Sequence, residues 1–178
     1  MLQRGDTASF TELAVATSKI NDAKSAISRD YQGKDLILIA VLKGAVVFLS
    51  DLMREIDVPL TIDFMSVSSY SGTKSSGVVK IIKDIDQDIA GKDVLIVEDV
   101  VDTGLTLRHL KKLLATRGPA SIRLCTAFDK PDCRVVDVDV DYIGMSIPNE
   151  FVVGYGLDYK QLYRQLPYVA VLADDGKD

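Results

Sequence analysis

The pattern of apolar and polar positions predicts strands that alternate with helices along the chain. Residues 36–42 (LILIAVL) are apolar throughout, which is typical of a parallel strand buried on both faces of a sheet,. Residues 93–97 (DVLIV) predict a second buried strand, which stops at two acids. Shorter apolar stretches between turn-forming residues predict further strands at 59–67, 78–82, 121–128 and 138–143.

Helices are predicted where apolar side chains recur every three or four positions. Residues 9–12 (SFTE) fit a capping box, so the first helix is expected to start there and to end near Gly33,. A second helix is expected to begin at Gly44. A third is expected to span 105–117 and to stop at the Gly-Pro pair that follows,.

This alternation predicts an α/β fold with a mainly parallel sheet flanked by helices. The chain has 178 residues and contains neither a linker nor an internal repeat, so residues 1–178 are expected to form a single domain,. Residues 148–166 are irregular in pattern, apart from a short strand predicted at 151–153.

Composition and charge argue against several classes of partner. The net charge of −5 and the pI near 4.9 disfavour a nucleic-acid-binding protein, which would normally be basic,. The longest apolar run, 36–42, is too short to span a bilayer, and the N-terminus has no signal-peptide pattern,. We therefore expect a cytoplasmic protein with no nucleic-acid or membrane partner. Cys125 and Cys133 are expected to be free thiols, with Cys125 buried in a strand,.

Candidate chemistry gathers where two of the predicted strands end. Lys43 follows 36–42, and Glu98 and Asp99 follow 93–97. In open parallel sheets, ligands bind at the carboxyl ends of the strands. These three side chains therefore mark the expected active site.

The run VLIVEDVVDTGLTLRHL, residues 94–110, joins acids to the start of a helix. Backbone N–H groups of 102–106, with the hydroxyls of Thr103 and Thr106, can hold a phosphate. The two acids after the strand can hold sugar hydroxyls, directly or through Mg²⁺. Phosphoribosyl pyrophosphate suits both halves, since it has a terminal phosphate, a diol and a metal-binding polyanion. The run lacks the spacing of a P-loop or a dinucleotide fingerprint.

Five segments together resemble the type I phosphoribosyltransferases, and most closely the bacterial hypoxanthine or hypoxanthine-guanine group. They cover nearly all of 36–166: VLKGA, DFMSVSSYSG, VLIVEDVVDTGLTL, DKP and IPNEFVVGYGLDYKQLYRQLP. The resemblance implies purine salvage, in which the phosphoribosyl group of phosphoribosyl pyrophosphate passes to hypoxanthine or guanine with the help of Mg²⁺. It also implies a homodimer or homotetramer, a core at about 35–145, and a small hood built from the N-terminal segment and about 146–170.

By this resemblance, Asp102 is the general base that takes a proton from the purine ring, although it could also, or instead, cap the following helix. Glu98 and Asp99 contact the sugar and bind Mg²⁺. The 5′-phosphate is implied to lie on four consecutive residues, Thr103, Gly104, Leu105 and Thr106. Some relatives have lysine where this chain has leucine, so the backbone and the threonines are expected to carry phosphate recognition.

Two further segments are implied to meet the pyrophosphate and to close the site. Lys43 supplies a cation and Gly44 a close backbone approach, while Ser69 and Tyr70 belong to a lid at 68–77 that excludes water,. Other interpretations remain open: the lysine could extend to the surface over apolar neighbours, and 68–77 could be an ordinary hairpin tip.

The remaining residues are implied to bind the purine and the leaving group. Lys130 donates a hydrogen bond to the 6-oxo group, which favours oxopurines over adenine because an ammonium group can only donate. Phe151 stacks on the base and the Val152 backbone meets its edge. Asp158 binds a second Mg²⁺ and Arg164 reaches the pyrophosphate. A solvated lysine, a core phenylalanine, a turn cap and a surface ion pair are the alternatives.

Two other functions fit the same motifs. One is a nucleotide-sensing regulator that binds RNA on the same fold, which the acidic charge disfavours,. The other is a transferase that prefers xanthine, which differs from guanine only at position 2 of the ring.

Overall fold

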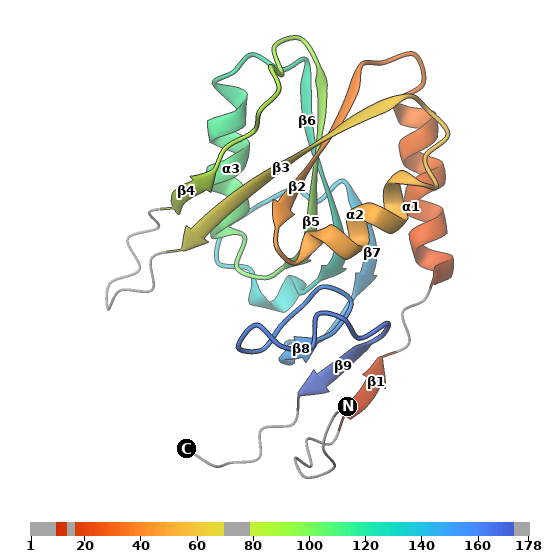
Figure 1. The fold of residues 1–178 in the computed structure, drawn as a ribbon, viewed down its shortest axis with the longest axis vertical. Helices are drawn as coiled ribbons and strands as arrows, with labels where there is room; N and C mark the ends of the chain where they lie inside the picture. Colours follow the sequence, from red (N-terminus) through yellow and green to blue (C-terminus); the bar gives the residue numbers. More distant parts are fainter. Residues whose placement is uncertain (1–9, 14–16, 70–78, 173–178) are drawn as a thin grey trace.

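A six-stranded sheet forms the centre of the computed structural model, which describes residues 10–13, 17–69 and 79–172. The strands lie in the order β4-β3-β2-β5-β6-β7, and all pairs are parallel except β3 with β4 (Figure 1). Their bounds are β2 (Leu36–Leu42), β3 (Leu60–Ser69), β4 (Val79–Lys83), β5 (Asp93–Val101), β6 (Ser121–Asp129) and β7 (Tyr142–Ser146). The predicted α/β fold with a mainly parallel sheet is therefore confirmed.

Helices cover both faces of this sheet, which explains the unbroken apolar run of β2. Side chains alternate between the two faces of a strand. Leu36, Leu38 and Ala40 pack with the face covered by α1 (Thr17–Asp30) and α2 (Ala45–Met53). The intervening side chains pack on the opposite face with α3 (Leu105–Ala115). Both faces of β2 are thus buried, and the strand must be apolar at nearly every position.

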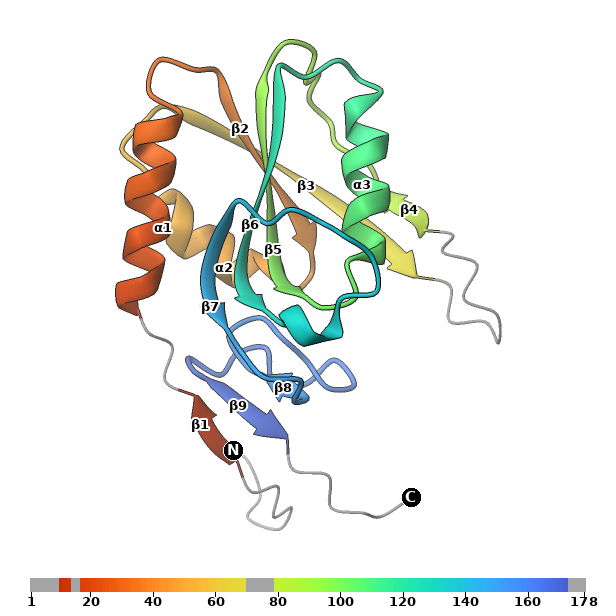
Figure 2. The same cartoon turned by 180° about the vertical axis from the view of Figure 1, so that it is seen from behind.

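A second, antiparallel sheet lies beyond the carboxyl ends of the central strands (Figures 1 and 2). Its order is β1-β9-β8, with β1 (Phe10–Leu13), β8 (Val152–Val153) and β9 (Val169–Leu172). We call these three strands, together with 154–168, the hood. The chain thus brings its first described strand beside its last one.

The first helix does not begin where the capping-box pattern predicted. Residues 10–13 form β1 instead, in antiparallel register with 169–172, and α1 begins at Thr17. Pairing with a strand more than 150 positions away has overridden the local helix signal, as tertiary context often does. The prediction for 10–13 is therefore wrong, whereas the end of the helix near Gly33 agrees with the structure.

Three other strands differ from the predictions. β5 continues through Glu98 and Asp99 to Val101, because β6 extends beside it and pairs as far as Asp129. β7 begins at Tyr142 rather than at residue 138, since the Asp141 carboxylate accepts the Leu124 N–H before the ladder starts. β9 was not predicted. Most of the predicted lid lies outside the described residues; Ser68 and Ser69 are the end of β3.

Both cysteines are free thiols, as predicted, with Cys125 buried in β6 and Cys133 half-buried. Among the residues that the structure describes, no helix is both long and apolar enough to cross a membrane.

Candidate active site

A tight turn links the end of β5 to α3 and forms the centre of the site. Gly104 adopts a left-handed conformation, φ 79°, and a side chain there would also approach the Val136 carbonyl oxygen to 3.2 Å,. The Thr103 N–H donates to the Asp102 carboxylate over 2.5 Å. The N–H groups of Val135 and Val136 donate to the Thr103 carbonyl over 3.1 and 3.3 Å. Residues 135 and 136 therefore hold the turn in place where it leads into α3.

Glu98 and Asp99 are consecutive residues near the end of β5. The Glu98 Oε2 atom is buried and has no hydrogen-bond partner within the described part of the chain. Burial raises the pKa of Glu98 well above its usual range, and the charges of Asp99 and Asp102 add to this,. Burial also raises the pKa of Asp99, against the opposing effect of the Val100 N–H. Both carboxyls would be stabilised by a ligand that brings a cation or hydroxyl donors.

The turn between β2 and α2 packs directly against Asp99. A side chain on Gly44 would place its Cβ 1.4 Å from the Asp99 Oδ2 atom, and one on Gly156 would lie 2.1 Å from the Gly44 carbonyl oxygen. Only glycine fits at position 156, where the clash is with backbone, whereas a side chain at position 44 would require the Asp99 carboxylate to move. The backbone of the β2–α2 turn is thus tightly packed between β5 and the hood.

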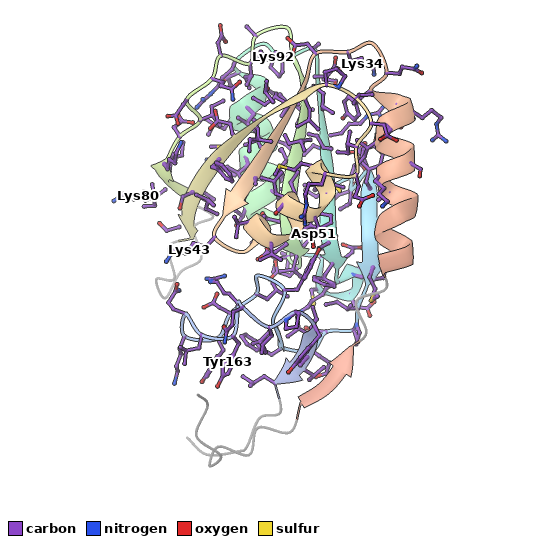
Figure 3. All side chains as sticks on the ribbon, turned by 45° about the vertical axis from the view of Figure 1, so that its right-hand side comes forward. Lys34, Lys43, Asp51, Lys80, Lys92 and Tyr163 are labelled. Carbon is purple, nitrogen blue, oxygen red and sulfur yellow. The ribbon has the colours of Figure 1, made fainter. Side chains whose placement is uncertain are left out.

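Lys43 lies at the end of the core that faces the hood, whereas Lys34 and Lys92 lie at the opposite end (Figure 3). Its Nζ atom donates to the Gln161 side-chain oxygen over 3.1 Å, and the lysine is otherwise exposed. The cation therefore points into the space between the core and the hood.

A pocket of about 460 Å³ opens beside the β5–α3 turn. It brings together predicted residues from three separate segments: Asp102 with Thr103, Lys130, and Phe151. The remaining lining residues are Cys133, Asn149 and Glu150. The Lys130 Nζ atom donates to the Glu150 carbonyl over 2.6 Å, which leaves other ammonium hydrogens for a ligand,. A carboxylate, an ammonium donor and an aromatic ring thus face one cavity.

The aromatic wall of this pocket is accessible. Phe151 is 53% exposed and packs edge-to-face against Tyr159, with the ring centroids 5.8 Å apart. The side chain of Val152, which follows it, is buried, and Val152 pairs with Val171 of β9. Phe151, which directly precedes the hood, therefore contributes an exposed aromatic ring to the pocket.

Two more predicted residues form an ion pair in the hood. The Arg164 Nη2 atom lies 2.6 Å from the Asp158 Oδ1 atom, and the Arg164 Nη1 atom donates to the Gly156 carbonyl. The loop between them contains three non-glycine residues in the left-handed region: Lys160, Gln161 and Tyr163. Backbone strain of this kind often collects at ligand sites.

The three predicted metal ligands Glu98, Asp99 and Asp158 do not form one cluster, since the described residues contain no group of three acids, histidines or cysteines arranged for a metal. Glu98 and Asp99 nevertheless fit Mg²⁺, which is often held by one or two carboxylates together with substrate oxygens and water. The unpartnered Glu98 oxygen supports this fit.

Three residues that contact the site were given no role from the sequence, although Asp129 and Gln161 lie within the quoted segments. Gln161 holds Lys43, while Asp129 and Arg134 hold the turn that carries Asp102. Gln161 acts across 118 positions of sequence and Arg134 acts on backbone carbonyls, so no spacing rule could identify either role.

Comparison with known proteins identifies the family. Residues 9–160 match the family described as "Phosphoribosyl transferase domain". The chain belongs to the phosphoribosyltransferase family. A hypoxanthine-guanine phosphoribosyltransferase from Streptococcus mutans is 50% identical over 165 residues, which are 92% of this chain and 90% of that protein. One from Mycobacterium avium is 60% identical over 79% of this chain and 70% of its own length.

Solved structures of this family have the same fold. A crystal structure of a hypoxanthine-guanine phosphoribosyltransferase from Bacillus anthracis superposes with a TM-score of 0.88 at 44% identity, over 92% of this chain and 98% of that one. A hypoxanthine phosphoribosyltransferase from Trypanosoma cruzi gives a TM-score of 0.89 at 39% identity, over 96% and 94% of the two chains. The predicted family, the type I phosphoribosyltransferase fold and the prediction of a transferase are therefore confirmed.

Proposed function

We propose that the protein is a purine-salvage enzyme that transfers the 5-phosphoribosyl group of phosphoribosyl pyrophosphate to hypoxanthine or guanine. The products are IMP or GMP and pyrophosphate. One observation carries the proposal: Asp102, Lys130 and Phe151 line a single pocket beside the turn that leads into α3. A base in this pocket would lie next to a sugar phosphate bound at the turn.

The donor sugar is proposed to bind along the β5–α3 turn. Its 5′-phosphate lies on the N–H groups and hydroxyls of residues 103–106, where the N-terminus of α3 favours an anion. The ring hydroxyls face Glu98 and Asp99, which supply the hydrogen-bond acceptors that the diol requires. The pyrophosphate extends toward Lys43, Gly44 and the arginine of the hood, Arg164.

Glu98 and Asp99 are the residues that would hold Mg²⁺ at the sugar, and Asp158 would hold one at the pyrophosphate. When bound, Mg²⁺ neutralises charge on the departing pyrophosphate. The protein contributes the oxygen ligands and, by burying them, strengthens their interaction with the cation.

The base is proposed to enter the pocket with its ring against Phe151. Lys130 donates to the 6-oxo group, so adenine, which has an amino donor there, is rejected. Asp102 takes the proton from the imidazole ring as the purine nitrogen bonds to the anomeric carbon. Carboxylates nearby also stabilise the positive charge that develops on the sugar. Residues 68–77, with Ser69 and Tyr70, are proposed to close over the sugar and exclude water.

The proposal also covers the cellular setting. We infer a cytoplasmic enzyme with no nucleic-acid or membrane partner, assembled as a homodimer or homotetramer. The net charge of −5 supports the absence of a nucleic-acid partner, and light scattering of the purified protein would test the oligomeric state,.

A spectrophotometric assay with phosphoribosyl pyrophosphate, Mg²⁺ and each base in turn tests the proposal. We expect turnover of hypoxanthine or guanine and none of adenine. A preference for xanthine would show that xanthine, not hypoxanthine or guanine, is the acceptor base. RNA binding without turnover would favour the nucleotide-sensing regulator instead of an enzyme.

The Asp102→Asn variant tests the role of the proposed base. We expect a loss of about 10²–10⁴-fold in kcat, the usual contribution of general-base catalysis, with KM for phosphoribosyl pyrophosphate little changed. An unchanged kcat would remove Asp102 from the role of base.

A further inference from the structure

We infer that Arg134 is a positioning residue, which holds Asp102 and Lys130 at a fixed separation across the base pocket. The inference rests on the proposed function, because it assigns these two residues to one bound purine. It adds a residue that neither the motifs nor the pocket lining identifies.

The need for such a residue follows from the ends of β5 and β6. The two strands pair as far as Val101 with Asp129, and the Lys130 N–H then donates to the Val101 carbonyl over 2.9 Å. Beyond this point Asp102 turns toward α3, while Lys130 enters the short 3₁₀ helix Pro131–Cys133. The strand ladder therefore ends just before the two residues whose separation matters for a bound base.

The Arg134 guanidinium lies where the segments that follow β5 and β6 separate. Its Nη1 atom donates to the carbonyls of Val101 and Asp102 over 2.8 and 2.5 Å, and lies 3.5 Å from the Lys130 carbonyl. Its Nη2 atom forms an ion pair with Asp129. The side chains of Arg134 and Asp129 are only 19% and 8% exposed, so water screens these contacts weakly,. The planar guanidinium thus links the segment that follows β5 to the segment that follows β6.

The guanidinium supports the pocket from outside it. Cys133 lines the pocket and Arg134 does not, so no ligand contact is needed to explain the arginine. The phosphate-binding half of the turn is held separately, by the N–H groups of Val135 and Val136 on the Thr103 carbonyl. Loss of the guanidinium should therefore displace Asp102 and Lys130 while the phosphate site persists.

This separation gives a test that distinguishes positioning from simple stabilisation. Arg134→Met removes the guanidinium, and Arg134→Lys keeps the charge but cannot reproduce the planar set of donors. We expect kcat with hypoxanthine to fall about 10–100-fold in Arg134→Met, because displacement of a reacting group by about 1 Å can cost 10²-fold. We expect the KM for hypoxanthine to rise and the KM for phosphoribosyl pyrophosphate to stay within about twofold. Arg134→Lys should recover only part of kcat.

Arg123, near the amino end of β6, offers a matched control. Its Nη1 atom donates to the Asp30 carboxylate and to the Tyr142 hydroxyl over 3.0 and 2.7 Å, so it is another partly buried arginine in a polar network. Arg123→Met should lower Tm and leave kcat per folded site unchanged. Asp129→Asn breaks the ion pair but leaves the carbonyl contacts of Arg134, so its loss of kcat should be smaller than that of Arg134→Met.

The outcomes are distinct. A lowered Tm with unchanged kcat and KM in the Arg134 variants would make the arginine merely structural and overturn the inference. If Arg134→Met does not fold, Arg134→Lys and Asp129→Asn decide the question. The same three quantities are compared: kcat, the KM for hypoxanthine and the KM for phosphoribosyl pyrophosphate. Wild-type protein inactive with every purine would overturn the proposed function, and this inference with it.

Discussion

Gly44 approaches Asp99 so closely that one methyl group should couple the β2–α2 turn to β5. In Gly44→Ala the new Cβ would lie 1.4 Å from the Asp99 Oδ2 atom and 2.5 Å from its Cγ atom. The carboxylate must therefore rotate away. It would lose the Val100 N–H that its Oδ1 atom accepts over 2.8 Å, a charged hydrogen bond worth about 1.5–3 kcal/mol,. A strained rotamer would add about 1 kcal/mol.

A double-mutant cycle measures this effect. The clash disappears in Asp99→Ala, since only the Asp99 Cβ remains, 3.3 Å from the added methyl group. We expect urea unfolding of the wild type, the two single variants and the double variant to give a coupling free energy of about 2–4 kcal/mol. The double variant should be more stable than the sum of the single effects predicts.

The same cycle with Asp63→Ala provides the control. Asp63 is also a buried acid, but it accepts the N–H groups of Phe64, Asp86 and Gln87 and has no contact with Gly44. Its effect should add to that of Gly44→Ala within about 0.5 kcal/mol. Additivity in the Asp99 cycle as well would refute the close contact from which the coupling was calculated.

Two further predictions concern groups at the site. Burial raises the folded-state pKa of Glu98, so its favourable contribution to folding is complete below the unfolded pKa, about 4.3, and is lost as pH rises through the folded pKa,. The free energy of unfolding of wild type relative to Glu98→Gln should therefore fall as pH rises above about 4 in urea titrations, and a constant difference would contradict this. Burial also raises the pKa of Cys125, whereas Cys133 lines the pocket. Alkylation of the native protein, followed by mass spectrometry, should label Cys133 alone and be slowed by IMP; labelling of both thiols, or no protection, would count against the pocket.

The predictable parts of the fold are those whose signal is local. The apolar run of β2 and the acidic run at the end of β5 are visible in the sequence because burial on both faces and a helix start each require particular residue types. The strand at 10–13 was missed because its partner is β9, and nothing within either segment reports that pairing. A capping-box pattern therefore outweighed a contact that only the folded chain provides.

The site residues also divide into those that the sequence indicates and those that only the folded chain reveals. Asp102, Lys130 and Phe151 were found through a family resemblance, and the structure brings all three to one pocket. Arg134 was missed because it binds backbone carbonyls, which every residue has, so its partners leave no pattern of side chains. The contact of Gly44 with Asp99 was likewise invisible, since it depends on how two neighbouring strands are aligned.

The pairing of β1 with β9 has a consequence for how the enzyme matures during synthesis. The hood sheet needs residues 169–172 at its centre, between the strands at 10–13 and 152–153, so it cannot be completed until residues 169–172 have left the ribosome. The β5–α3 turn lies some 65 residues earlier and belongs to a sheet whose strands are already present. A nascent chain should therefore acquire its sugar-phosphate half before its purine half, and activity should await the synthesis of β9.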